Sequence, residues 1–294
     1  MSATNHFQAQ KLFDVKGYVC VITGGGTGIG LMAAQALAAN GARVYITGRR
    51  LEVLETAAKT HDPSTPGSGS IIPLGPCDVT KKDDLAKIVA ELESKESHIH
   101  TLMCNAGVGG PKSDPSSSSA TDLKKTLWEN ESVEEWGETY KVDVTAVYFT
   151  TLAFLPLLQA AIPHTRRFAP SVLVTSSMSG LMRHAQAHFA YNAAKAATVH
   201  LTKLMSAEFQ KLGIRVNSVA PGYFPSEMTA KESDAGNKSF LPDEKVLDKG
   251  HEVPLMRAGE ETEMGMAVLF FARNEYVNGQ IVAVDGGVLN SVAS

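Results

Sequence analysis

The sequence predicts an α/β protein, in which a single doubly wound domain carries a seven-stranded parallel sheet with helices on both faces. Three observations support this fold. Short apolar runs alternate with helix-length segments along the chain. Most of these runs are continuously apolar, as in strands buried on both faces of a parallel sheet. A glycine-rich turn follows the first run, where such sheets bind ligands.

The predicted strands and helices alternate throughout the chain, which is typical of parallel strands joined by helical crossovers. The strands are Tyr18–Thr23, Arg43–Thr47, Ser70–Leu74, His100–Cys104, Ser171–Thr175, Arg215–Ala220 and Gln280–Val284. The helices are Leu31–Ala39, Leu51–Thr60, Lys81–Ser94, Val133–Ala161, Ala187–Lys211 and Glu260–Ala272.

Three segments interrupt this alternation. Asp62–Ser70 is a loop by composition, and Gly109–Asp122 contains a run of serines that predicts a mobile insertion. Gly222–Pro254 has no long helical period and precedes the last predicted helix. We expect this third segment to be a substrate lid, with the serine-rich insertion at its rim.

Composition limits the possible partners. The chain has 294 residues, 44% hydrophobic and 20% charged, with a net charge of −4. Neither nucleic acid nor a membrane is expected as a partner, because basic clusters and long apolar runs are missing from the sequence. Three widely spaced cysteines without a CxxC pair predict no metal site and a reducing compartment. We therefore expect a cytoplasmic protein.

The sequence TGGGTGIG joins the first predicted strand to the first helix. Its glycines have the spacing G-x-x-x-G-x-G, which permits a tight turn and close approach of a pyrophosphate to the helix N-terminus. The alternative is a glycine-rich turn without a ligand, but the order strand, turn, helix favours dinucleotide binding. The expected cofactor contacts in this turn are Gly24, Thr27, Gly28, Ile29 and Gly30.

The end of the second strand indicates which dinucleotide is bound. Gly48 stands where NAD-binding units place an acid for the ribose hydroxyls, and Arg49 and Arg50 follow it. Arginine at this point suits a 2′-phosphate, so the sequence predicts NADP(H). The alternative is a solvated basic pair at a helix start.

Tyr191 and Lys195 are four residues apart, so they share one face of a predicted helix. An ammonium beside a phenol favours the phenolate, and such a tyrosine can exchange a proton with an alcohol oxygen. Ser177 follows a predicted strand at the sheet edge that binds ligands. The Tyr–Lys spacing alone is common on helix surfaces, so the interpretation depends on this context.

Together these motifs resemble the short-chain dehydrogenase/reductase family from about Lys11 to Leu289. The resemblance rests on seven motifs in the order found in the family: TGGGTGIG, CDV, CNAG, SSMSG, YNAAK, PG and VNGQ through DGG. The resemblance implies a Rossmann-type fold, Tyr191 as proton donor or acceptor, Lys195 on the nicotinamide ribose, and Ser177 on the substrate carbonyl. It also implies cofactor contacts at Asp78, Val79, Asn105, Ala106, Gly107, Pro221, Gly222, Phe224 and Ser226.

Asp143 is a departure from the family pattern, in which an asparagine holds a helix bend and a water that links the lysine to solvent. We retain Asp143 as a catalytic candidate. The separation of Ser177 and Tyr191 is 191 − 177 = 14, one longer than is common in the family.

The substrate is predicted to be a medium-sized, largely apolar ketone or secondary alcohol. The candidate contacts besides Ser177 are Met182, Phe189, Tyr223 and Met228, some of which are equally well explained as packing residues. The leading function is an NADPH-dependent ketoreductase. The alternatives are a non-redox step such as epimerisation, dehydration or cyclisation at the same site, and a non-catalytic NADP(H)-binding protein.

Assembly is predicted from the two longest helices, which carry more apolar residues than one sheet face can cover. We expect a closed homo-oligomer, a tetramer in preference to a dimer.

Overall fold

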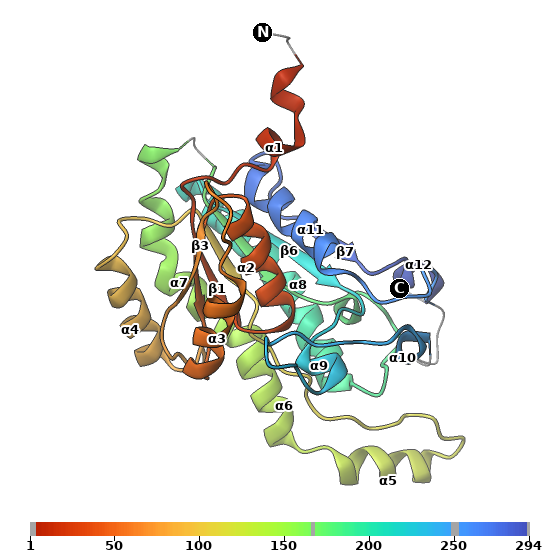
Figure 1. Ribbon diagram of the computed structural model, residues 1–294. Coiled ribbons are helices and arrows are strands. Elements are labelled where there is room, and N and C mark those ends of the chain that lie inside the picture. The colour runs from red at the N-terminus through yellow and green to blue at the C-terminus, as the bar shows by residue number, and fades with distance from the viewer. Residues whose placement is uncertain (1–3, 166–167, 248–252, 293–294) are drawn as a thin grey trace.

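Seven parallel strands form one sheet in the computed structural model, which describes residues 4–165, 168–247 and 253–292. The strand order is β3-β2-β1-β4-β5-β6-β7 (Figure 1). The strands are β1 Val19–Thr23, β2 Arg43–Thr47, β3 Ser70–Pro73, β4 Thr101–Cys104, β5 Ser171–Thr175, β6 Arg215–Pro221 and β7 Ile281–Val284. All seven predicted strands are confirmed to within one residue at each end.

The order of the strands reverses at β1, which pairs with β2 on one side and with β4 on the other. The chain therefore winds outward in both directions from this point. The carboxyl ends of β1 and β4 open a crevice between them, and open α/β sheets bind ligands in such a crevice. The predicted glycine turn lies here, directly after β1.

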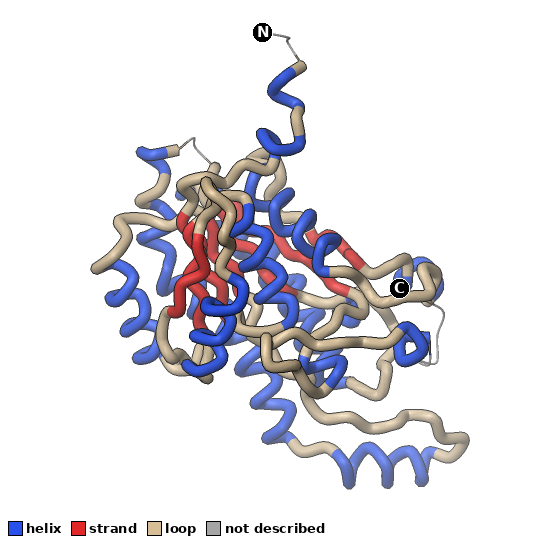
Figure 2. Tube along the Cα trace, in the orientation of Figure 1, coloured by secondary structure: helices blue, strands red, loops and turns tan. Residues whose placement is uncertain are grey.

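Helices cover both faces of the sheet (Figure 2). One core cluster packs α2, α3 and α11 against the strands, and the other packs α4, α7 and α8 against the opposite face. The longer helices are α2 Gly28–Ala39, α3 Leu51–His61, α4 Lys82–Glu93, α5 Ala120–Asn130, α6 Val133–Tyr140, α7 Ala146–Gln159, α8 Phe189–Phe209 and α11 Glu261–Arg273. Four short helices are α1 Ala9–Leu12, α9 Glu227–Ala230, α10 Asp243–Leu247 and α12 Val288–Ser291.

The predicted helix Val133–Ala161 is continuous in the structure from Val133 to Gln159, but its middle is not α-helical. A π-helical turn, Lys141–Thr145, separates α6 from α7. Helix α5 was not predicted either. It follows the serine-rich segment, buries no residue of its own, and projects from the body in Figure 1. Ser119 caps its start by accepting a hydrogen bond from the amide of Asp122.

The stretch Val133–Gln159 is the one part of the described chain that is long and apolar enough to cross a membrane. Of its most apolar segment, 44% is buried inside the protein. Phe154, Leu157 and Leu158 of α7 pack in the core beneath the sheet. The core helix of a protein packs against a sheet in this way. The length and composition of Val133–Gln159 are therefore weak evidence for a membrane span.

The amino edge of the sheet contains a fully buried arginine. Arg215 begins β6, and four of its N–H groups donate to the backbone carbonyls of Phe168, Ala169, Phe271 and Val277 at 2.6–3.2 Å. Burial lowers the pKa of Arg215 to about 10, so the side chain stays charged at neutral pH. This residue joins β6 to the start of β5 and to the end of α11.

Candidate active site

The turn after β1 leaves the amino end of α2 bare. Thr27 is the N-cap of α2, but its side chain makes no capping hydrogen bond. Gly28 has φ +50°, in the left-handed region that favours glycine, and a side chain at Gly30 would collide with the carbonyl of Gly24. These conditions account for the glycine spacing. The free N–H groups and the positive end of the α2 dipole suit a pyrophosphate.

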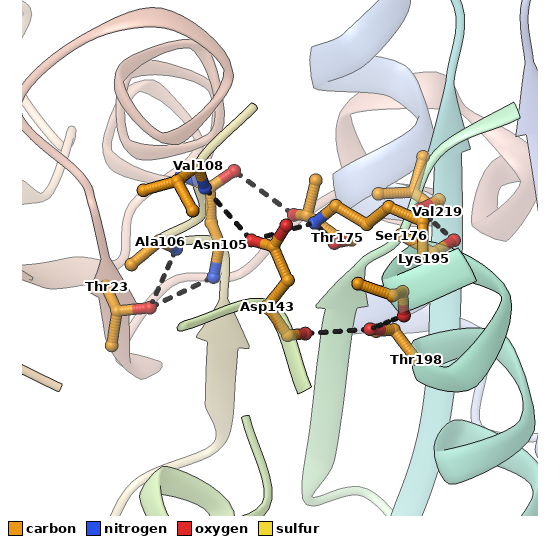
Figure 3. A network of polar contacts seen from close by, with 11 residues as sticks. Thr23, Asn105, Ala106, Val108, Asp143, Thr175, Ser176, Lys195, Thr198 and Val219 are labelled. Carbon is orange, nitrogen blue, oxygen red and sulfur yellow. Dashed lines mark hydrogen bonds and ion pairs between the residues drawn. The ribbon is translucent and has the colours of Figure 1, made fainter. Parts of the chain in front are cut away.

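Asn105 ties the ends of three neighbouring strands together. Its backbone N–H donates to Thr23 Oγ1 at 3.0 Å, and its side-chain amide donates to the carbonyl of Gly24 at 3.1 Å. Thr175 Oγ1 donates to Asn105 Oδ1 at 3.1 Å (Figure 3). The amide therefore fixes the turn after β1 relative to the ends of β4 and β5. The family-like CNAG sequence serves here to hold the crevice in shape.

Two adjacent serines at the end of β5 have different environments. Ser176 Oγ donates to the carbonyl of Val219 at 3.1 Å and accepts from Ser218 Oγ at 2.7 Å, which ties it into the sheet. Ser177 Oγ accepts from the amide of Ser179 at 3.1 Å. The Ser177 hydroxyl proton remains available for an acceptor in the crevice. The geometry thus favours Ser177 as the substrate-side serine.

Tyr191 and Lys195 lie on α8, one turn apart, and both line the same cavity as Ser177. The Lys195 ammonium is 5.6 Å from the centre of the Tyr191 ring. It is almost fully buried and donates to the carbonyl of Thr175 at 3.2 Å. A fixed, buried positive charge beside a phenol stabilises the phenolate, because little solvent screens it.

Asp143 lies in the π-helical turn and is fully buried. Its Oδ1 accepts from the amide of Val108 at 3.0 Å and is 3.7 Å from Lys195 Nζ, while its carbonyl accepts from Thr198 Oγ1 at 2.7 Å (Figure 3). Its Oδ2 has no hydrogen-bond partner among the described residues. Burial raises the pKa of Asp143, and Lys195 and the Val108 amide only partly offset this effect. π-Turns are frequent at functional sites.

The far end of the cavity is formed by the residues after β2 and β3. Arg49 and Arg50 follow β2, and Arg50 Nη2 is 2.7 Å from Glu227 Oε2. Asp78 Oδ1 accepts hydrogen bonds from the amide and hydroxyl of Thr80. Burial opposes ionisation of Asp78, but the Thr80 hydrogen bonds and the nearby cations, Arg49 among them, hold its pKa below the usual range.

One cavity of about 320 Å³ brings most of the sequence-predicted residues together. Those that line it are Gly24, Thr27, Gly28, Ile29, Arg49, Arg50, Asp78, Val79, Asn105, Ala106, Gly107, Ser177, Tyr191, Lys195, Pro221, Gly222, Phe224, Ser226 and Met228. Gly30 and Asp143 lie directly behind this lining, in contact with Gly24 and Lys195.

Three candidate substrate residues do not line this cavity. Met182 packs in a buried apolar cluster with Met178 and Val246, and Phe189 is 37% exposed at the start of α8. The hydroxyl of Tyr223 accepts from the amide of Gln186 at 2.8 Å, and burial raises the Tyr223 pKa. The structure thus places Met182 in packing and Tyr223 in a polar chain.

The comparisons with known proteins agree with this geometry. A family profile described as "Enoyl-(Acyl carrier protein) reductase" matches residues 24–289. "Short-chain dehydrogenase/reductase PhomF" of Diaporthe leptostromiformis is 40% identical, over 100% of this chain and 98% of that protein. "Short-chain dehydrogenase/reductase VdtF" of Byssochlamys spectabilis is 36% identical, over 97% of each chain. The chain belongs to the short-chain dehydrogenase/reductase family.

Solved structures support the same family. A short-chain type dehydrogenase/reductase from Mycobacterium marinum superposes with a TM-score of 0.78 at 27% identity, over 96% of this chain and 99% of that one. The Pseudomonas aeruginosa "RhlG/NADP active-site complex" gives 0.76 at 26% identity, over 94% and 98%. As a short-chain dehydrogenase/reductase, the protein is an oxidoreductase that uses a nicotinamide cofactor on a small-molecule substrate.

Several cavity residues of this short-chain dehydrogenase/reductase escaped the sequence interpretation. Thr175 and Val108 hold Lys195 and Asp143 in place, and Glu227 pairs with Arg50. Glu227 follows Ser226 directly, but no local pattern shows that it reaches a strand end 177 residues away. Among the described residues, no group of three or more potential ligands is arranged to hold a metal ion.

Proposed function

We propose that this short-chain dehydrogenase/reductase is an NADPH-dependent ketoreductase, which transfers a hydride between the nicotinamide and a ketone or secondary alcohol. One observation carries the proposal. Ser177, Tyr191 and Lys195 converge in a single cavity whose other end holds the bare amino end of α2 and two arginines. A proton-transfer group, its tuning cation and an anion site then lie within reach of one dinucleotide.

The residues present fit the cofactor. The turn at Gly28 and the free N–H groups of α2 would hold the pyrophosphate, Arg49 the 2′-phosphate, and Lys195 the nicotinamide ribose. The bound nicotinamide supplies the hydride. Phe224 and Ser226 line the cavity beside Pro221 at the end of β6, on the side where the nicotinamide would lie.

The proton steps belong to the protein. The Ser177 hydroxyl donates a hydrogen bond to the substrate carbonyl oxygen, which polarises the carbonyl. As the carbonyl carbon accepts hydride, Tyr191 gives its phenolic proton to the developing alkoxide. The Lys195 ammonium stabilises the phenolate that remains. In the reverse direction the phenolate takes the proton from the alcohol, so the same three groups serve both directions.

Cofactor preference is the next part of the proposal. Its support is Arg49, which follows Gly48 in the place where an acid would bind ribose hydroxyls, and a structural relative whose title names NADP. NADPH should bind about ten- to a hundredfold more tightly than NADH, and Arg49→Ala should remove most of that difference, since a charge-assisted contact is worth about 1.5–3 kcal/mol. Equal affinity of the wild type for both cofactors contradicts this part.

We also propose a medium-sized, largely apolar substrate and a homo-oligomer. Phe224 and Met228 give the cavity an apolar border. Tyr148 on α7 and Leu204 on α8 are 39% and 52% exposed, which leaves apolar surface for a second copy. Light scattering at micromolar concentration tests the assembly, and a monomeric mass would rule out the homo-oligomer. A preference for a small, highly charged substrate would rule out the apolar substrate class.

The function is tested by following NADPH oxidation over a panel of ketones. The wild type should turn over at least one apolar ketone. Tyr191→Phe should lose about 10²–10⁴-fold in turnover while NADPH affinity stays within about twofold, because only the transferable proton is removed. A Tyr191→Phe variant with near-full activity would rule out Tyr191 as the proton donor. A wild type that binds NADPH without oxidising it in the presence of any ketone would point to a non-redox step at this site or to a binding protein.

A further inference from the structure

An ion pair crosses the cavity at its phosphate end. Arg50 extends from the end of β2 and meets Glu227, the first residue of α9, at 2.7 Å. Both side chains line the same cavity as the glycine turn. The pair therefore joins two walls of the proposed cofactor cleft, above the place where the pyrophosphate would lie.

The segment that carries Glu227 also rests on the opposite wall, at the glycine turn and at α3. We call residues 226–238 the strap. A side chain at Gly28 would lie 2.9 Å from Cβ of Ser226, so the strap touches the glycine turn directly. Farther along, Asn237 donates to the carbonyl of Val53 in α3 at 2.8 Å. The strap thus spans the cleft from β6 to α3.

The two contacts differ in their relation to the cofactor. The Asn237 hydrogen bond joins the strap to the backbone of Val53, which also lines the cavity, and it involves no charged group. The Arg50–Glu227 pair lies in the cavity, and its arginine is one of the two cations available for a 2′-phosphate. Glu227 already satisfies this arginine with an anion that belongs to the chain.

Charges at this end are balanced before any cofactor arrives. The field of Arg49 acts on Asp78, and Arg50 is held by Glu227. A phosphate that binds Arg50 must therefore take this arginine away from a carboxylate. Phosphate carries more charge and three acceptor oxygens, so it can win this exchange, whereas a ribose hydroxyl has no charge with which to compete.

We propose that Glu227 is a specificity-determining residue, which competes with the cofactor 2′-phosphate for Arg50. This inference rests on the proposed binding of NADP(H). Glu227 lowers the affinity for the phosphorylated cofactor while it leaves the affinity for NADH unchanged. Both arms of the pair are partly exposed, at 53% for Arg50 and 36% for Glu227, so the effect is modest.

The test compares Glu227→Gln with a matched control. Lys238 of the strap pairs with Glu261 of α11 at 2.6 Å, with exposures of 40% and 51%, outside the cavity. Glu261→Gln therefore removes a strap-to-body ion pair of the same length and similar exposure that no cofactor can reach. Dissociation constants for NADPH and NADH are measured by fluorescence titration for the wild type and both variants. Adenosine 2′,5′-bisphosphate, measured by calorimetry, reports the phosphate end alone.

Glu227→Gln should tighten NADPH and the bisphosphate about two- to fivefold and change NADH by less than about 1.5-fold, in line with a partly exposed ion pair. Glu261→Gln should change none of them. Equal tightening of NADPH and NADH would show a strap that merely obstructs the cleft, and weaker NADPH binding would show that Glu227 orients Arg50 for the phosphate. Either result overturns the proposal.

The cofactor preference and the competition for Arg50 can fail independently of each other. If the wild type binds NADPH and NADH equally, the proposed cofactor preference fails. Glu227→Gln should then still tighten NADPH alone, because it frees Arg50. If the wild type prefers NADPH but Glu227→Gln leaves the NADPH-to-NADH ratio unchanged, the preference stands and the competition fails.

Discussion

The two edges of the sheet each bury a cation, and the two cations have different surroundings. At the amino edge, Arg215 donates four hydrogen bonds to backbone carbonyls and has no carboxylate within hydrogen-bond reach in the described chain. At the carboxyl edge, Lys195 makes one hydrogen bond to the Thr175 carbonyl, and its neighbour Asp143 keeps one buried oxygen without a hydrogen-bond partner in the part of the chain that the structure describes.

This difference separates a structural charge from a functional one. A buried cation that spends four of its five N–H donors on backbone carbonyls holds backbone segments together and can do little else. A buried cation with most of its donors unused, beside an incompletely bonded carboxyl, can still bind a ribose, hold a water or respond to a change of charge nearby. Mutations at the two edges should therefore affect different properties, and four experiments can break or sharpen the comparison.

The largest effect is expected for Lys195→Met. Turnover should fall about 10³-fold, about 4 kcal/mol in barrier, because the field that stabilises the Tyr191 phenolate and a ribose contact are both lost. The free energy of unfolding should change by less than about 1 kcal/mol, since the buried Asp143 can take up a proton once the ammonium is gone. Steady-state kinetics and urea unfolding measure the two quantities. A large loss of stability would remove the contrast between the edges.

Arg215→Met should show the opposite pattern. It removes four donors from buried carbonyls and should cost about 3–4 kcal/mol of unfolding free energy. Turnover per folded molecule should stay within about twofold, because Arg215 lies at the far edge from Tyr191. Arg215→Lys serves as the control, since it keeps the positive charge but loses the planar guanidinium with its several N–H donors. Its free energy of unfolding should lie between those of the wild type and Arg215→Met. An Arg215→Met protein as stable as the wild type would contradict the structural role.

The third experiment uses a histidine at the same amino edge. His100 Nδ1 accepts from the amide of Val19 at 3.0 Å, and its ring stacks on Tyr18 at 4.4 Å. Burial lowers its pKa to about 4, with His98, Arg43 and His164 adding to the effect and Glu96 opposing it. The unfolded chain, with an ordinary histidine pKa near 6.5, binds more protons between these values. Stability should therefore fall as the pH drops from about 6.5 to 4.

The loss of stability between pH 6.5 and pH 4 can be estimated from the lowering of the His100 pKa. Each pKa unit corresponds to about 1.4 kcal/mol, so His100 accounts for roughly 2–3 kcal/mol of the loss. His100→Asn keeps an acceptor for the Val19 amide but cannot titrate, and it should flatten this part of the curve. Urea unfolding at pH 4, 5, 6 and 7 measures the effect. An unchanged slope in the variant would assign the acid loss to other groups.

The strands and the site motifs could be predicted from the sequence, but the contacts that tune the site could not. The run Ser171–Thr175 is apolar and β-branched, and that local pattern is what a buried strand requires. The Tyr191 and Lys195 spacing is likewise local. The π-turn around Asp143 and the Arg50–Glu227 pair depend on tertiary contacts between distant segments, which leave no periodic signal. The packing of Met182 could not be predicted for the same reason, because most of the side chains around it, such as Val246 and Val288, come from distant parts of the chain.

The smallest effect is expected for Asp143→Asn. The asparagine can keep the contact to the Val108 amide through its oxygen, and the backbone carbonyl can keep its bond from Thr198. What changes is the charge 3.7 Å from Lys195. An ionised Asp143 partly cancels the field of Lys195 at Tyr191, so its removal should favour the phenolate. Activity should stay within about threefold or rise, and the alkaline limb of the reductase pH profile should move to lower pH.

A stability measurement provides an independent check on the same variant. Burial raises the pKa of Asp143, so the folded chain holds its proton more tightly than the unfolded chain does. The contribution of this group to stability is then greatest at acid pH and is lost as the pH rises through its folded pKa. Asp143→Asn cannot titrate and should lack this loss, which urea unfolding from pH 4 to 8 would reveal. An Asn variant that binds cofactor but has no activity would mean that the carboxyl itself takes part in the proton steps, and the contrast with Arg215 would become sharper still.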